Sequence, residues 1–153
     1  MKRKWFGLIF WLALVFAAAL TGVFVSTDGW YAELNKPAWN PPDWIFGPVW
    51  TVLYIMMAVA AWRVWLRGGW NVQCKPLALF LVQWVLNALW TPLFFGFDLA
   101  GWALVDVLVL LAFILLTIKA FRPVDRVAAC LMVPYAVWVA FASVLNFTIW
   151  RLN

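Results

Sequence analysis

Five long apolar runs, separated by short breaks rich in proline, glycine or charge, constrain this chain more than any single motif. A helix needs about 20 mainly apolar residues to cross the hydrocarbon core of a bilayer, and each run has that length. Hydrophobic residues form 68% of the 153-residue chain and charged residues 11%, whereas a soluble domain is about half apolar and about a quarter charged. Since lipid offers no partner for backbone polar groups, we predict an all-α integral membrane protein, a bundle of five transmembrane helices forming one domain over residues 1–153.

The breaks between the runs set the limits that we expect for each helix. The pairs at 68–69 (Gly-Gly) and 122–123 (Arg-Pro) are typical helix ends. The connection at 97–99 is so short that the third and fourth helices must be antiparallel neighbours, and Pro134 predicts a kink in the fifth. The first run resembles a secretory signal peptide, but at about 20 residues it exceeds the usual 7–15, so we expect a retained helix. The expected spans are about 5–25, 44–66, 76–95, 100–121 and 124–150.

The stretch at 30–50 is the longest interruption of the apolar pattern, and it holds four prolines and four tryptophans. Proline fixes φ and removes a backbone donor, so this stretch cannot be a single helix. It is also too aromatic for a solvated linker, because large rings are usually packed against something. We therefore expect residues 27–43 to form a structured lid over a pocket at one end of the bundle, with a short helix at 30–35.

The net charge of +5 comes from 11 Lys and Arg residues against 6 Asp and Glu residues, and the cations lie at the ends of the apolar runs. Because they form no basic stripe, we expect them to contact membrane lipid, and we expect no nucleic-acid partner. With the N-terminus in the cytoplasm, nine of the 11 Lys and Arg residues fall on the cytoplasmic side, as the positive-inside rule requires. The lid then lies on the non-cytoplasmic side, with Lys36 and Arg151.

Histidine is absent, which removes the usual haem ligand and the commonest metal ligand. The two cysteines, Cys74 and Cys130, are far apart and provide neither a disulfide framework nor a zinc site. We expect no metal site and no cofactor. A bound tetrapyrrole would be held mainly by stacking and polar contacts, unless a Met or Cys sulfur ligates its metal.

Polar and aromatic side chains recur at helical spacing on one face of three predicted helices. Gln83 and Asn87 are four residues apart and share a face, and polar side chains deep in a membrane tend to face the bundle interior. The three faces would wall a pocket with indole rings and few polar groups, with a recess at small Ala142 beside Trp138, which suits a planar apolar ligand. The faces consist of Gln83, Asn87, Trp90 and Phe94 in the third helix, Trp50, Tyr54 and Met57 in the second, and Trp138, Ala142, Leu145 and Asn146 in the fifth.

Each of these assignments has a purely structural alternative. Amides such as Gln83 and Asn87 often bridge helices in lipid. Asp106, the only carboxylate well inside a span, is either a proton-relay group or a neutral or hydrogen-bonded side chain, and it has no evident partner for acid–base catalysis. Ala18 and Gly22 form a small-residue face that would pack helices or join two protomers. An interfacial belt is favoured for the tryptophans near helix ends, namely Trp5, Trp11, Trp62, Trp65, Trp70, Trp102 and Trp150.

Several motifs occur in order along the chain. The most specific is Lys-Pro-Ala-Trp-Asn-Pro-Pro at 36–42, preceded by Trp-Tyr at 30–31. Further motifs follow at 92–96 (Pro-Leu-Phe-Phe-Gly), 101–106 (Gly-Trp-Ala-Leu-Val-Asp), 134–138 (Pro-Tyr-Ala-Val-Trp) and 142–147 (Ala-Ser-Val-Leu-Asn-Phe). Over nearly its whole length the sequence resembles the translocator protein family, also called peripheral benzodiazepine receptors or tryptophan-rich sensory proteins.

This resemblance implies a five-helix bundle, often a homodimer, whose first loop caps a pocket. It implies binding of porphyrins such as protoporphyrin IX, of sterols, and of synthetic benzodiazepine-type or isoquinoline ligands. In some bacterial members two pocket tryptophans are implicated in porphyrin breakdown, and these positions match Trp50 and Trp138. The predicted ligand-binding residues are Tyr31, Trp39, Pro41, Trp50, Tyr54, Asn87, Trp90, Phe94, Trp138, Ala142 and Leu145.

Three functions follow as hypotheses. The first is a receptor, sensor or carrier for porphyrins and similar planar ligands, and the second is an enzyme that degrades porphyrin with light and oxygen through Trp50 and Trp138. The third, a transporter, has the least support. Val144, Phe147 and Arg151 fall in the register of the family's sterol motif, but Phe replaces Tyr, so a sterol or hopanoid-like lipid is a weaker expectation. Because the sequence has no basic tail after Asn153, we expect a bacterial inner membrane.

Overall fold

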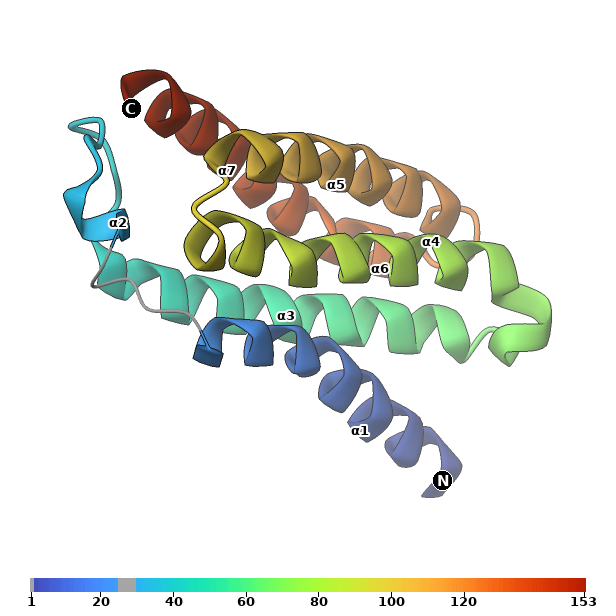
Figure 1. Cartoon of the computed structure of the whole chain (residues 1–153). Coiled ribbons are helices and arrows are strands. Elements are labelled where there is room, and N and C mark those ends of the chain that lie inside the picture. The colour runs from blue at the N-terminus through green and yellow to red at the C-terminus, as the bar shows by residue number, and fades with distance from the viewer. Residues whose placement is uncertain (1, 25–29) are drawn as a thin grey trace.

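The computed structural model describes residues 2–24 and 30–153, and helices form all the regular structure in those ranges (Figure 1). Five helical segments are long and apolar enough to cross a membrane, which confirms the predicted all-α bundle. They are built from α1 (Lys2–Ala17) with η1 (Ala18–Phe24), α3 (Asp43–Trp65), α4 (Gly69–Thr91) with η2 (Pro92–Gly96), α5 (Ala100–Phe121), and α6 (Arg126–Leu131) with α7 (Val133–Leu152).

The second and fourth spans begin and end within one residue of the expected limits, whereas the third begins earlier than expected. The glycine pair does interrupt the helix as predicted, since Gly68 and Gly69 have φ values of 126° and 68°. Helix α4 then starts at Gly69 instead of Pro76, and its backbone leaves helical geometry at Gln73, with φ −107° and ψ 27°. The proline therefore follows a kink inside a longer helix, and the predicted start was wrong by seven residues.

The kink predicted at Pro134 is confirmed. The fifth span divides into α6 and α7 at Met132, two residues before the proline. Proline cannot donate a backbone hydrogen bond, and its ring crowds the preceding turn, so the helix restarts with Pro134 in its first turn.

The first span changes its winding near its end. The α-helix gives way to a 3₁₀ helix at Ala18, and that helix continues to Phe24. The expected end of this span at residue 25 and the expected start of the lid at 27–29 lie outside the described residues. The short helix expected at 30–35 is present as α2 (Trp30–Glu33).

Helix α5 packs against both α4 and α7, and α1 packs along α3. Gly7 permits the second contact, because a Cβ atom there would lie 2.5 Å from the ring of Trp65. Trp11, which we expected in an interfacial belt, is instead buried and meets the ring of Phe80 edge-on at 5.6 Å. Figure 1 shows the two ends of the bundle clearly: the lid and the C-terminus lie at one end, and α3 passes into α4 at the other.

Candidate functional site

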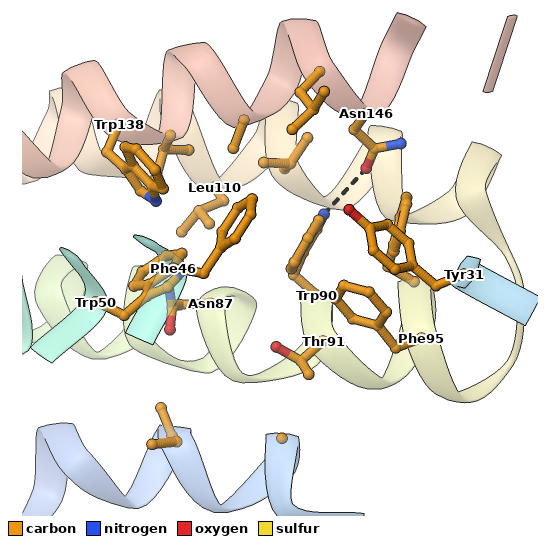
Figure 2. Close-up of a pocket in the computed structure, with 18 of the residues that line it drawn as sticks. Tyr31, Phe46, Trp50, Asn87, Trp90, Thr91, Phe95, Leu110, Trp138 and Asn146 are labelled. Atoms are coloured by element: carbon orange, nitrogen blue, oxygen red, sulfur yellow. Dashed lines mark hydrogen bonds between the residues drawn. The ribbon is translucent and has the colours of Figure 1, made fainter. Parts of the chain in front are cut away.

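A cavity of about 330 Å³ lies beneath the lid, between η1, α2, α3, α4 with η2, α5 and α7. Its walls are mostly apolar and aromatic, and a volume of this size is in the range of small-molecule sites, about 300–1,000 Å³. Figure 2 shows the rings of Trp50 and Trp138 at one side of the cavity, with Trp90 and Tyr31 at the other.

Trp50 and Trp138 come from different helices and line the same cavity. The Trp50 ring lies 5.4 Å from the ring of Tyr54, and Trp138 meets Phe46 edge-on at 5.9 Å. Neither indole N–H has a hydrogen-bond partner within residues 2–24 and 30–153. Both rings are therefore positioned by aromatic neighbours, and the indole N–H of each is available to donate a hydrogen bond to a ligand.

Asn87 joins three helices at the base of the cavity. Its side-chain oxygen accepts a hydrogen bond from the Tyr54 hydroxyl at 3.0 Å, and its amide nitrogen donates to the Tyr135 hydroxyl at 3.0 Å. The bonds connect α4 to α3 and α7, as the bridging alternative predicts. Because Asn87 also lines the cavity, it fixes the spacing of the walls while contributing to their surface.

Asn146 of α7 likewise joins three helices, closer to the lid. Its side-chain oxygen accepts from the Trp90 indole N–H at 3.1 Å, the bond drawn in Figure 2, and its nitrogen donates to the Ala100 carbonyl at 2.9 Å. The Trp90 donor is therefore engaged, in contrast to those of Trp50 and Trp138. The ring of Trp90 stacks on Phe94 with centroids 5.2 Å apart.

Tyr31 brings the lid into the cavity wall. Its buried ring contacts Phe95 edge-on at 5.0 Å, and the Lys36 ammonium lies 4.0 Å from the ring centroid on the ring face. Burial raises the pKa of Tyr31 above its ordinary value of 10.0. A side-chain hydrogen bond with Asn40 lowers the pKa in part, and the negative charge of Asp43 raises it further. The hydroxyl therefore stays protonated at neutral pH, and Figure 2 shows it directed toward the side of the cavity that holds Asn146.

The structure brings most of the predicted ligand-binding residues together, with two exceptions. Trp39 is 47% exposed and meets Phe141 edge-on at 6.0 Å, outside the cavity, and Pro41 does not line it either. The residues that do line the cavity are Tyr31, Trp50, Tyr54, Asn87, Trp90, Phe94, Trp138, Ala142 and Leu145.

Sequence reasoning missed part of the wall. Phe46 lies one helical turn before Trp50, a spacing that could have identified it. The sequence did not distinguish Val107 and Leu110, because apolar residues occur on every face of α5. Ala18 and Gly22 also line the cavity; Ala18 is buried in the core, whereas Gly22 is exposed.

Other predicted residues lie away from the cavity. Gln83 is fully buried, and neither end of its amide has a partner in the described part of the chain. Asp106 is buried with one carboxylate oxygen likewise unpartnered in that part. The residues in the register of the sterol motif are exposed on α7 outside the cavity, namely Val144, Phe147 and Arg151.

The sequence profile of the TspO/MBR family matches residues 9–151. The chain belongs to this family. Among relatives of the TspO/MBR family, the tryptophan-rich protein TspO of Chlorobaculum tepidum is 49% identical over 126 residues, which are 81% of this chain and 79% of that one. The tryptophan-rich sensory protein of Cereibacter sphaeroides is 42% identical over 153 residues, 100% of this chain and 95% of that one. The human translocator protein is 41% identical over 134 residues, 85% of this chain and 79% of that one.

Proposed function

We propose that this protein is a membrane receptor or carrier that binds protoporphyrin IX and similar planar apolar molecules in the cavity beneath the lid. One observation carries the proposal: Trp50 and Trp138, from two different helices, line a single cavity. Membership in the TspO/MBR family supports a sensor or receptor role in the membrane.

The chemistry of the walls favours a planar apolar ligand. Aromatic faces bind flat rings by offset or edge contacts, and the two asparagines of the cavity are already engaged by Tyr54, Tyr135 and Trp90. A ligand with many polar groups would leave some of them unpaired at a cost of about 1–3 kcal/mol each. The Trp50 and Trp138 indole N–H groups and the Tyr31 hydroxyl suffice for a few peripheral polar atoms.

Titration of protoporphyrin IX into the detergent-solubilised protein tests the proposal through quenching of tryptophan fluorescence. We expect saturable quenching, and a Trp138→Ala variant whose midpoint is at least tenfold higher, which corresponds to about 1.4 kcal/mol. Trp102→Ala is the matched control, because Trp102 is exposed on α5 and does not line the cavity. Equal midpoints for the parent and Trp138→Ala would exclude the cavity as the porphyrin site.

The same two indoles support a second candidate, an enzyme that degrades bound porphyrin with light and oxygen. Trp50 and Trp138 are redox-capable and line one cavity, so electrons could pass from a bound porphyrin through either ring to oxygen. The test is the illuminated loss of porphyrin absorbance in air. Phe at both positions should abolish the loss while retaining most of the binding, and unchanged rates would reject indole chemistry.

We further propose that the protein lies in a bacterial inner membrane with its N-terminus in the cytoplasm and its lid outside. The charge asymmetry of the connections supports this orientation. Cys74 offers a native reporter, because it is exposed near the start of α4, at the end opposite the lid. In a Cys130→Ser background, a membrane-impermeant thiol reagent should label Cys74 only after the inner membrane is permeabilised, and labelling of intact spheroplasts would reverse the orientation.

A further inference from the structure

The end of the bundle opposite the lid carries a concentration of positive charge that the cavity does not use. The ends of α3 and α5 and the starts of α1, α4 and α6 lie toward this end (Figure 1). Asp125 is the one carboxylate at this end in the described part of the chain, since Glu33, Asp43 and Asp98 lie toward the lid. The cations at this end whose side chains are described are Lys4, Arg63, Arg67, Lys75, Lys119, Arg122 and Arg126.

Asp125 organises two of these cations. Arg63 donates to both of its carboxylate oxygens, from Nε to Oδ1 at 3.2 Å and from Nη2 to Oδ2 at 3.0 Å. Arg67 donates from Nη2 to Oδ2 at 3.2 Å, and the Ala128 backbone N–H donates to Oδ1 at 2.9 Å. The carboxylate side chain is only 3% exposed, so it has no access to further cations. Two guanidinium groups are thus held in place with one positive charge in excess.

A hollow of about 530 Å³ opens beside this group. Lys119, Arg122 and Arg126 also line it and are exposed, and none of them forms an ion pair within residues 2–24 and 30–153. The hollow therefore has five cations and one carboxylate, a net charge of 5 − 1 = +4. The Arg67 side chain is 57% exposed and uses one of its nitrogens on Asp125, and its other donors have no partner among the described residues.

The position of the hollow indicates where its partner comes from. It lies where α3 and α5 end, two helices long and apolar enough to cross a membrane, so the membrane surface is expected at this level. Trp62 and Trp70 are near the same level, as expected for interfacial tryptophans. Val127 lines the hollow and is exposed, so an apolar surface adjoins the cations. A ligand that fits must combine a compact anion with an apolar body.

We propose that this hollow binds the phosphate headgroup of an anionic phospholipid in the adjacent membrane leaflet. Guanidinium groups bind phosphate oxygens through paired hydrogen bonds, and basic pockets between transmembrane helices are suited to such headgroups. The Asp125 carboxylate holds Arg63 and Arg67 in position, and Arg122, Arg126 and Lys119 supply charge that no carboxylate among the described residues neutralises. The site is separate from the cavity under the lid and does not depend on a porphyrin.

Native mass spectrometry of the full chain in neutral detergent tests the proposal, with phosphatidylglycerol and phosphatidylcholine of identical acyl chains as probes. We expect the parent to retain phosphatidylglycerol preferentially. Since each cation contributes about a fivefold factor near an anionic lipid surface, the Arg122→Gln/Arg126→Gln variant should retain it at least about tenfold less. This variant spares both ion pairs of Asp125, so the fold is preserved.

The matched control is Lys4→Gln/Lys75→Gln, which removes the same charge from the same end without altering the lining of the hollow. Full retention by this control would support a defined site, whereas a loss equal to that of the arginine variant would reduce the binding to diffuse attraction and overturn the proposal. Equal retention of both lipids by the parent would also overturn it. Displacement of phosphatidylglycerol by an equal concentration of pyrophosphate would assign the hollow to a soluble anion instead.

Discussion

The two ends of this bundle are closed by different physical means. At the lid, closure rests on aromatic edges, one cation–π contact between Lys36 and Tyr31, and amide hydrogen bonds. At the opposite end, one buried carboxylate holds two guanidinium groups and a backbone N–H. Each contact at the lid is weak and can be broken separately. At the opposite end, the hydrogen bonds of Arg63, Arg67 and the Ala128 N–H all depend on the single Asp125 carboxylate.

From this difference we infer that the lid end opens more easily than the charged end. On the proposed function, we expect a ligand to reach the cavity by displacing some of the lid's contacts, each of which costs about 0.5–1.5 kcal/mol to break. The charged end offers no such route, because separating Asp125 from its partners leaves a buried charge unpaired. We therefore expect exchange of ligands at the lid and structural stability at the other end, and substitutions at each end can test that division.

The largest effect is expected at Asp125. Asp125→Asn keeps the shape of the side chain but removes its charge, so the bonds from Arg63 and Arg67 weaken and the two cations repel each other. Because those side chains are 33% and 57% exposed, water compensates in part, and we expect a loss of about 2 kcal/mol in the free energy of unfolding. Thermal unfolding in detergent micelles, followed by tryptophan fluorescence, measures it.

Asp98→Asn is the control for that experiment. It removes the same charge from the turn before α5, near the lid, where Asp98 has φ 56° and Asn is well tolerated. We expect a change within about 0.5 kcal/mol. A comparable loss from both substitutions would show that net charge, and not the Asp125 group, determines stability.

Acid should remove the same contribution without a substitution. Burial alone would raise the pKa of Asp125, but hydrogen bonds from the Ala128 N–H, Arg67 and Arg63 outweigh it and lower the pKa below the ordinary value of 3.8. A lowered folded-state pKa means that the contribution is present above pH 3.8 and is lost as the pH falls below it. The gap in melting temperature between the parent and Asp125→Asn should therefore shrink between pH 5 and pH 3. A constant gap would contradict the role of the carboxylate charge.

A smaller effect is expected between the two ends, at Asn87. Asn87→Leu removes its bonds to Tyr54 and Tyr135. Hydrogen bonds between membrane helices are worth roughly 0.6 kcal/mol on average, so we expect a loss of about 1 kcal/mol in the free energy of unfolding. The triple variant with Phe at both tyrosines should recover part of it, because no hydroxyl is then left unpaired. No recovery would mean that Asn87 acts by shape alone.

The sequence predicted the features that depend on local residues and missed those that depend on how the helices pack. Apolar length and helix breakers placed the spans, because each acts locally, and the proline-rich stretch identified the lid. The start of α4 escaped prediction, since the chain turns at Gly68 and bends again at Gln73 before reaching Pro76. Trp11 escaped too, because its burial against Phe80 depends on how α1 meets α4.

At the cavity, spacing on single helices identified Trp50, Asn87 and Trp138, whose faces repeat every three or four residues. Asp125 was not singled out, because a lone carboxylate in a basic connection carries no periodic signal. Its partner Arg63 is 62 residues away in the sequence. Only the approach of α3 to the start of α6 brings them together, and that approach is a property of the whole bundle.

The smallest effect on stability, and the sharpest test of the division, is expected at the contact between the lid and α7. The Asn153 side chain pairs with the backbone of Asn35, accepting from its N–H at 2.9 Å and donating to its carbonyl at 3.1 Å. Asn153→Ala should cost only about 0.5–1 kcal/mol in the free energy of unfolding, since these groups are exposed and water replaces the bonds. Thr148→Ala, which removes a hydroxyl bonded within α7, is the control.

We expect amide hydrogen exchange at Trp30–Glu33 to accelerate several-fold in Asn153→Ala alone, with unchanged exchange at α6. Equal acceleration at both ends would show that the lid does not open independently, and the contrast between the two ends would then fail.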